Sequence, residues 1–178
     1  MSMDKKEVRK EVRKKLSAMP EELKMQKSMM LALALVVHPA VRDAKVVALF
    51  SPLSDEPQVG EILDIISQER TVVLPRIEGD EMEFYPYSPA SMCKGAYGIM
   101  EPMSGEPIAA DSIDVMIVPG VAFTADGARL GRGKGYYDKY MSHKGFRART
   151  IGVCYNEQVE ASLPCEPHDL KMDELVCR

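Results

Sequence analysis

Several features that would place this 178-residue chain in a specialised class are missing from its sequence. No apolar run is long enough to cross a membrane, and no apolar signal-peptide core follows the N-terminus. Acidic residues among the first eleven positions argue against a transit peptide. The four cysteines form no CxxC pair: Cys93, Cys154, Cys165 and Cys177. We therefore expect a cytoplasmic protein with reduced thiols, no membrane partner, no zinc site and no disulfide framework.

The sequence also lacks a surplus of positive charge. Its 23 Lys and Arg residues face 27 Asp and Glu residues, which gives a formal net charge of −4. Proteins dedicated to nucleic acids usually carry a basic surplus, so we expect no nucleic-acid partner. No repeat, low-complexity segment or linker divides the chain, and its length suffices for one hydrophobic core. We predict a single domain over residues 1–178.

The N-terminal region predicts a pair of helices. Apolar residues recur at helical spacing from Val8 to Met19, so residues 4–16 are predicted to form a helix with a narrow apolar stripe. Lys5 and Arg9 project over this stripe, whereas the other lysines of the helix face away from it. These two cations could face the protein body around an anion, or extend over the stripe with their charged ends in water. The pattern leaves both arrangements open.

A second helix is predicted from Pro20 to about Val37. Proline in the first turn, followed by two glutamates at the positive end of the helix dipole, favours a start there. The Met- and Leu-rich run over residues 25–36 is predicted to lie in the core. His38-Pro39 is predicted to end the helix.

Beyond residue 45 the apolar residues form short continuous runs, which are typical of strands buried on both faces. Such strands are predicted at 46–50, 71–75, 113–118 and 150–155, with a helix at 58–69, a half-exposed edge strand at 81–87, a loop at 89–107 and a final strand near Leu175. The alternation predicts an α/β fold with a mostly parallel sheet covered by helices. Ligands bind such sheets beyond the carboxyl ends of the strands, here after Phe50, Pro75 and Val118.

A glycine-rich stretch from Ile117 to Tyr140 is the strongest candidate for a ligand site. It contains five glycines, and three basic residues are interleaved with them: Arg129, Arg132 and Lys134. Glycine backbone, a following helix and basic side chains are what an anion-binding loop needs. The spacing matches neither the dinucleotide fingerprint nor the Walker A loop, because Gly135 follows Lys134 where that loop requires Ser or Thr. A flexible, solvated surface turn is the alternative.

Three acids could complete such a site. Glu56 follows the first predicted strand, Asp138 lies in the helix after the glycines, and Asp169 lies near the C-terminus. Magnesium uses one or two carboxylates with phosphate oxygens, so Asp138 is a candidate ligand. Each acid could instead be a helix-start, turn or solvated residue. The residues alone indicate a phosphate- or nucleotide-binding α/β enzyme.

The run Gly127-x-Arg129-Leu-Gly-Arg-Gly-Lys-Gly-Tyr-Tyr-Asp138 resembles the signature of the 5-formyltetrahydrofolate cyclo-ligases, also called methenyltetrahydrofolate synthetases. Further similar segments cover nearly the whole length: Lys5-x-x-x-Arg9, residues 50–56, Tyr97-Gly-Ile-x-Glu-Pro102, 163–169 and 173–174. The sequence departs from the family pattern at Thr124-Ala125-Asp126, where an aspartate usually follows the aromatic residue directly. Tyr97 also replaces the family's more frequent Phe or Trp.

The resemblance implies a three-layer α/β/α fold, like that of the sugar-phosphate isomerases and CoA transferases, with an N-terminal helical pair. It also implies ATP-dependent conversion of 5-formyltetrahydrofolate to 5,10-methenyltetrahydrofolate, Mg²⁺ as cofactor, and a monomer. The implied ATP-binding residues are Lys5, Arg9, Arg129, Leu130, Gly131, Arg132, Gly133, Lys134, Gly135, Tyr136 and Tyr137. The implied folate-binding residues are Ser51, Glu56, Tyr97, Arg132 and Tyr136. Arg132, Lys134 and Tyr136 are the implied catalytic residues, and Asp138 and Asp169 the implied metal ligands.

Two other functions stay open at this point. The chain could be a catalytically silent relative that binds folate or nucleotide, although its intact basic loop and acids weigh against this. It could also be a phosphotransferase acting on another small molecule. Glu56 and Tyr97, which suit a flat ring with N–H donors, make that alternative weaker.

Overall fold

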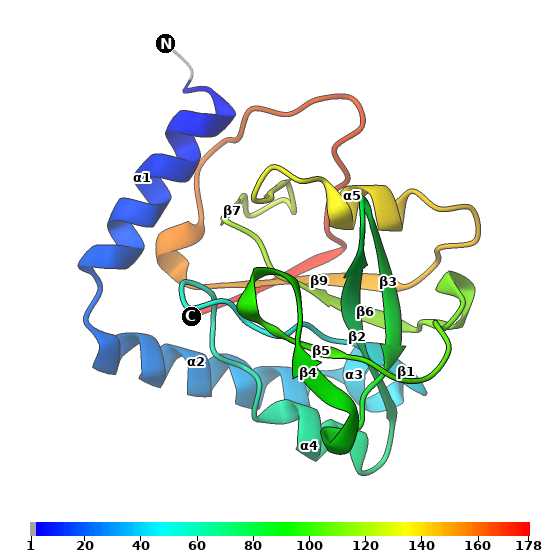
Figure 1. Cartoon of the computed structure of the whole chain (residues 1–178). Helices are drawn as coiled ribbons and strands as arrows, with labels where there is room; N and C mark the ends of the chain where they lie inside the picture. Colours follow the sequence, from blue (N-terminus) through cyan, green and yellow to red (C-terminus); the bar gives the residue numbers. More distant parts are fainter. Residues whose placement is uncertain (1–2) are drawn as a thin grey trace.

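The structure is a computed structural model that describes residues 3–178 and has a six-stranded sheet at its centre (Figure 1). The strand order is β10 (Glu174–Cys177), β9 (Arg149–Cys154), β6 (Val115–Val118), β1 (Val46–Ala48), β2 (Thr71–Glu78) and β3 (Glu81–Pro86). All neighbours are parallel except β3, which pairs with β2 in antiparallel fashion at the edge. The predicted α/β class, the mostly parallel sheet and the edge position of residues 81–87 are confirmed.

Alternate residues of the central strands enter two separate cores, which explains their continuous apolar sequence. On one face Val47, Val72 and Ile117 pack with residues of α1, α2 and α4. On the other face Ala48 and Val73 pack with residues of α5 and of the following loop. Helices therefore cover both faces, in the predicted three layers.

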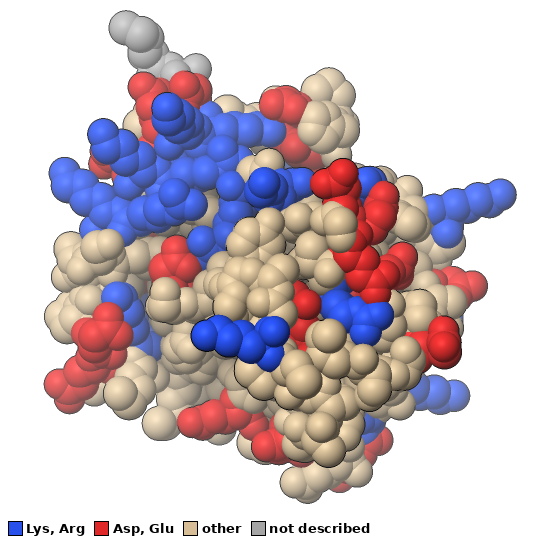
Figure 2. Space-filling view, viewed as in Figure 1, with Lys and Arg blue, Asp and Glu red and all other residues tan. Residues whose placement is uncertain are grey.

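The N-terminal helices are α1 (Lys5–Ala18) and α2 (Glu21–Val36). Asp4 and Glu7 form a capping box that satisfies the first backbone N–H groups of α1. The predicted stripe of α1 is buried, and the lysines of its other face are exposed, so that basic side chains gather over this helix in Figure 2.

The prediction that residues 25–36 lie in the core is wrong for much of α2. Met25, Met29, Met30 and Leu33 are more than half exposed, whereas Leu31 and Leu35 are fully buried. A helix packed on one side of a sheet buries only the face that meets the sheet. The apolar composition of α2 therefore overstated its burial.

Other boundaries differ because pairing and turns override local pattern. β2 continues to Glu78, past the loop predicted after Pro75, because β3 pairs with it as far as Glu81. The helix predicted at 58–69 is α4 (Ile62–Ser67), and the predicted loop at 89–107 contains the hairpin of β4 (Met92–Lys94) and β5 (Met100–Pro102). The remaining short helices are α3 (Pro39–Asp43), η1 (Pro89–Ser91), η2 (Ala96–Gly98), η3 (Ala110–Ser112) and η4 (Asn156–Gln158).

The glycine-rich stretch folds as a hairpin, a turn and a short helix. β7 (Ala122–Phe123) pairs with β8 (Arg129–Leu130), and a glycine turn leads into α5 (Tyr136–Met141). Gly133 and Gly135 have φ values of 111° and 72°, which only glycine adopts readily. None of the helices within residues 3–178 has the length and apolar character that a membrane crossing requires.

Candidate functional site

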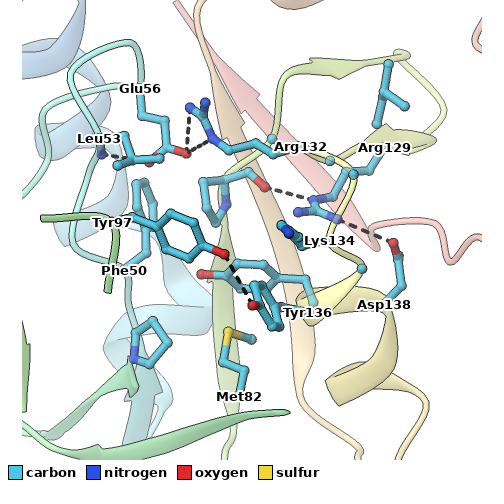
Figure 3. A pocket seen from close by; sticks show the side chains of 18 of the residues that line it. Phe50, Leu53, Glu56, Met82, Tyr97, Arg129, Arg132, Lys134, Tyr136 and Asp138 are labelled. Carbon is cyan, nitrogen blue, oxygen red and sulfur yellow. Dashed lines mark hydrogen bonds and ion pairs between the residues drawn. The ribbon is translucent and has the colours of Figure 1, made fainter. Parts of the chain in front are cut away.

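A pocket of about 400 Å³ lies beyond the carboxyl ends of β1 and β6 (Figure 3). It is lined by residues of α1, of the loop after β1, of β2, of the β4–β5 segment, of the glycine-rich stretch and of the C-terminal loop. Every residue that the sequence singled out for ATP, folate or metal lines this one pocket. Their individual roles stay predictions.

The N-terminal helix closes one side of the pocket. Nζ of Lys5 lies 2.8 Å from Oδ2 of Asp169 and 3.2 Å from a carboxylate oxygen of Glu166. Nε of Arg9 donates a hydrogen bond of 2.8 Å to the carbonyl of Gly131. Burial acts to lower the pKa of Lys5, but the hydrogen bonds to the two acids outweigh it and raise that pKa. Of the two arrangements that the sequence allows, Lys5 and Arg9 thus adopt the inward one.

Arg129 is buried below the glycine turn. Its Nε donates a hydrogen bond of 2.8 Å to the carbonyl of Pro119, and its guanidinium carbon lies 5.0 Å from the centre of the Tyr137 ring. Nη1 lies 3.8 Å from Oδ2 of Asp138. Burial lowers the pKa of Arg129, partly opposed by nearby carboxylates such as Asp138. A buried cation with such a distant counter-ion is well placed to stabilise an anionic ligand.

Arg132 points to the opposite side of the pocket. Its Nε donates to Oε1 of Glu56 at 3.1 Å, and Nη1 and Nη2 donate to Asp55. Oε2 of Glu56 accepts a hydrogen bond of 2.9 Å from the N–H of Leu53. Burial raises the pKa of Glu56, although the Leu53 N–H and Arg132 act in the other direction. The predicted phosphate ligand Arg132 is thus bound to acids, and one of them, Asp55, was not predicted as a site residue.

Two tyrosines face each other at the mouth of the pocket. The hydroxyls of Tyr97 and Tyr136 lie 3.3 Å apart, and Tyr97 is 60% exposed. Tyr97 has a φ of 58°, which is rare for a residue with a Cβ and costs strain energy. The hydrogen bond between the two hydroxyls raises the pKa of Tyr136. Ser51, on the same side, donates a hydrogen bond of 2.7 Å to the carbonyl of Met100. This bond connects the loop after β1 to β5.

Lys134 lines the pocket from the glycine turn, near the centre of the group drawn in Figure 3. Among residues 3–178 it has no ion-pair partner within 4.0 Å, unlike Lys5 and Arg132. A cation on a glycine turn, with no internal counter-ion, is suited to a phosphate group of a ligand.

The possible metal ligands fall into two groups. Glu166, His168 and Asp169 each offer a ligand atom within 4.8 Å of the others, whereas Asp138 lies beside Arg129. Glu166 and His168 line the pocket but were not predicted as site residues, although both belong to the segment of resemblance at residues 163–169. The acid Asp126, whose role the sequence left open, does not line the pocket and binds Thr124 and Lys171.

The fold and the pocket together define an α/β protein with a basic, glycine-rich pocket at the carboxyl edge of a parallel sheet, where such folds bind their ligands. The particular family follows from comparison with known proteins. The model of the 5-formyltetrahydrofolate cyclo-ligase family matches residues 1–178. The chain belongs to this family.

Individual relatives agree with the family match over nearly the whole length. The chain is 28% identical to the 5-formyltetrahydrofolate cyclo-ligase of Mus musculus, with 95% of this chain and 91% of the mouse protein covered. It is 31% identical to the probable 5-formyltetrahydrofolate cyclo-ligase of Schizosaccharomyces pombe, with 99% and 96% covered. The solved structure of Aquifex aeolicus 5,10-methenyltetrahydrofolate synthetase is similar with a TM-score of 0.89 at 38% identity, covering 98% and 90%.

Proposed function

We propose that this chain catalyses the ATP-dependent closure of 5-formyltetrahydrofolate to 5,10-methenyltetrahydrofolate, with release of ADP and phosphate. The observation that carries the proposal is the convergence of the family's signature residues, from both ends and the middle of the chain, on one pocket. We infer further that the chain works as one domain and as a monomer in the cytoplasm. The acidic net charge and the four free thiols support a cytoplasmic role without nucleic acid.

Charge divides the pocket into two subsites. Lys5, Arg9, Arg129 and Lys134 surround the glycine turn, where they would hold the triphosphate of ATP. Glu56 and the Tyr97–Tyr136 pair lie on the opposite side, where a carboxylate and aromatic rings suit a flat pterin with N–H donors. Arg132 contacts Glu56 and belongs to the same turn as Lys134, so it would lie where the two substrates meet.

Asp138 and Asp169 would hold Mg²⁺ together with phosphate oxygens. Their donor chemistry fits, because magnesium prefers a few carboxylate oxygens combined with phosphates. Asp138 lies 3.8 Å from Arg129, beyond normal hydrogen-bond length, so its oxygens keep free lone pairs. Asp169 would exchange its contact with Lys5 for the metal. When bound, Mg²⁺ supplies charge neutralisation on the phosphate oxygens.

The reaction balances as a phosphoryl transfer followed by ring closure. The formyl oxygen attacks the γ-phosphate, and ADP leaves. N10 then attacks the activated formyl carbon and releases its proton, and phosphate leaves with the former formyl oxygen. The protein's task is positioning and charge stabilisation, because phosphoryl transfer needs little covalent help. Lys134 and Arg132 would stabilise charge on the transferred group, while Tyr136 and Glu56 orient the folate.

The proposal is tested by incubating the purified chain with 5-formyltetrahydrofolate, ATP and Mg²⁺. The near-ultraviolet absorption of the methenyl product should develop together with ADP. Reactions without ATP, without Mg²⁺ or without folate are the controls. If wild-type protein that binds both substrates forms no methenyl product, the proposed reaction is wrong and a silent binding relative is the better account.

A further inference from the structure

Glu101 differs from the other acids that line the pocket. Glu56, Asp138, Glu166 and Asp169 each lie within 4.0 Å of a basic side chain. Glu101 forms no salt bridge within residues 3–178, and its Oε1 is shielded from solvent with no hydrogen-bond partner there. A buried polar atom without a partner is costly and rare in native proteins, so it calls for an explanation such as a functional role.

The backbone on both sides of Glu101 is held firmly. Ser51 donates a hydrogen bond of 2.7 Å to the carbonyl of Met100, and Arg76 donates one of 3.3 Å to the carbonyl of Pro102. Glu101 itself is the central residue of β5, opposite Cys93 of β4, and is 3% exposed. The position of its side chain is therefore set by the surrounding structure, and not by chance on a mobile surface.

The carboxyl of Glu101 touches the turn that presents Tyr97. A Cβ built on Gly95 would lie 2.2 Å from Oε2 of Glu101 and 2.8 Å from its Cγ. Gly95 has an ordinary φ of −101°, so its lack of a side chain makes room for Glu101 and is not needed for the backbone. The carboxyl thus lies against the start of the turn and on the pocket wall.

The surroundings of Glu101 are largely apolar and oppose its ionisation. Burial raises the pKa of Glu101, opposed by the backbone N–H groups of Ile77 and Ala96 and by Arg76. Carboxyl oxygens accept hydrogen bonds from N–H groups, which the edge of a pterin has and a triphosphate lacks. Two other residues of the pocket wall, Ile77 of β2 and Ile99 just before β5, are apolar and suit a flat ring.

We propose that Glu101 is a folate-binding residue, whose carboxyl accepts a hydrogen bond from an N–H group of the bound pterin. The proposal rests on the function proposed above, and it adds a second acidic contact on the folate side, separate from Glu56. It also gives Gly95 a role, since any side chain there would displace the carboxyl from its place on the pocket wall.

The test uses the full chain and three variants: Glu101→Leu, Glu101→Gln and Gly95→Ala. Leucine fills a similar volume without polar atoms, so Glu101→Leu should raise the KM for 5-formyltetrahydrofolate about tenfold, the effect of one lost hydrogen bond in a buried site. The KM for ATP should change less than twofold. Glu101→Gln keeps an acceptor oxygen in the same shape, so its folate KM should stay near the wild-type value. Gly95→Ala should resemble Glu101→Leu.

The exposed Glu106, four residues beyond the end of β5, supplies the matched control Glu106→Leu, which should leave both KM values unchanged. Isothermal titration calorimetry of 5-formyltetrahydrofolate provides a readout that needs no turnover, so a failure of the proposed reaction does not obscure the role of Glu101. An unchanged folate affinity in Glu101→Leu would overturn the proposal. So would folate and ATP affinities that fall together, or a Glu101→Gln variant as impaired as Glu101→Leu.

Discussion

Lys5 and Asp169 are 164 residues apart in the chain, yet they form an ion pair of 2.8 Å on the wall of the pocket. The pair joins the first turn of α1 to the C-terminal loop. In the proposed function both partners also serve ligands, because Lys5 would turn to the triphosphate and Asp169 to Mg²⁺. The helix would then be held by ATP as well as by the protein.

Replacing Lys5 with methionine should therefore weaken the binding of ATP more than the binding of folate. Loss of a charged contact to phosphate should raise the KM for ATP about tenfold or more, with little change in the KM for 5-formyltetrahydrofolate. The control Lys6→Met removes a neighbouring exposed lysine and should change neither value. Equal effects of the two variants would show a general field effect of the basic helix instead of a specific contact.

Saturating ATP should also protect α1 from proteases. The helix is held by a narrow apolar stripe and by Lys5 and Arg9, so a ligand that contacts both should shift the opening equilibrium toward the packed state. Limited trypsin digestion before Met19 should be slower with ATP and Mg²⁺ than without them. Identical cleavage rates would exclude a role for α1 in ATP binding.

Lys134→Ala should separate catalysis from stability. Because Lys134 has no ion-pair partner within the described chain, the variant should unfold at nearly the wild-type temperature. Its KM for ATP should rise strongly, or turnover should be lost, because a cation on the phosphate is removed. Lys144→Ala, at another exposed lysine, is the control. Unchanged kinetics would remove Lys134 from the site.

Glu56→Gln should weaken the binding of folate far more than the binding of ATP. The variant loses the negative charge that suits two N–H donors, while the basic turn stays intact. Asp55→Asn is the informative companion, because Asp55 shares Arg132 with Glu56 but does not line the pocket. If both variants lose folate affinity to the same extent, the effect comes from Arg132 and not from a contact between Glu56 and folate.

Asp55 should also give the protein an acid-sensitive component of stability. Burial acts to raise its pKa, but the hydrogen bonds and charge of Arg132 outweigh it and hold the pKa below its ordinary value of 3.8. A lowered pKa contributes stability above pH 3.8 that is lost as the pH falls through the lower, folded-state value. Urea unfolding should show Asp55→Asn less stable than wild type at pH 7, with the difference shrinking below about pH 4. A difference independent of pH would contradict this assignment.

Much of the fold could be predicted from the sequence, because continuous apolar runs such as Val46 to Phe50 require burial on both faces of a sheet. The β4–β5 hairpin could not, since its strands are three residues long and lie in a segment rich in Gly and Pro. The exposure of Met25 and Leu33 was likewise not visible, because composition does not tell which face of a helix is covered.

The site residues were predicted as a set, but their pairing was not. A guanidinium suits phosphate and carboxylate equally, so spacing could not show that Arg132 would lie on Asp55 and Glu56. Glu101 belongs to the Tyr97-to-Pro102 segment of resemblance, but nothing in the sequence distinguished it as a site residue. Its missing partner is a property of the packed structure.

The most direct test of the proposed chemistry follows one oxygen atom. If the formyl oxygen attacks the γ-phosphate, it must leave with that phosphate when N10 closes the ring. 5-Formyltetrahydrofolate labelled with oxygen-18 in the formyl group should therefore transfer its label to inorganic phosphate, one atom for each methenyl product formed. Mass spectrometry of the phosphate measures this. Label found in water, with unlabelled phosphate, would contradict phosphorylation of the formyl oxygen.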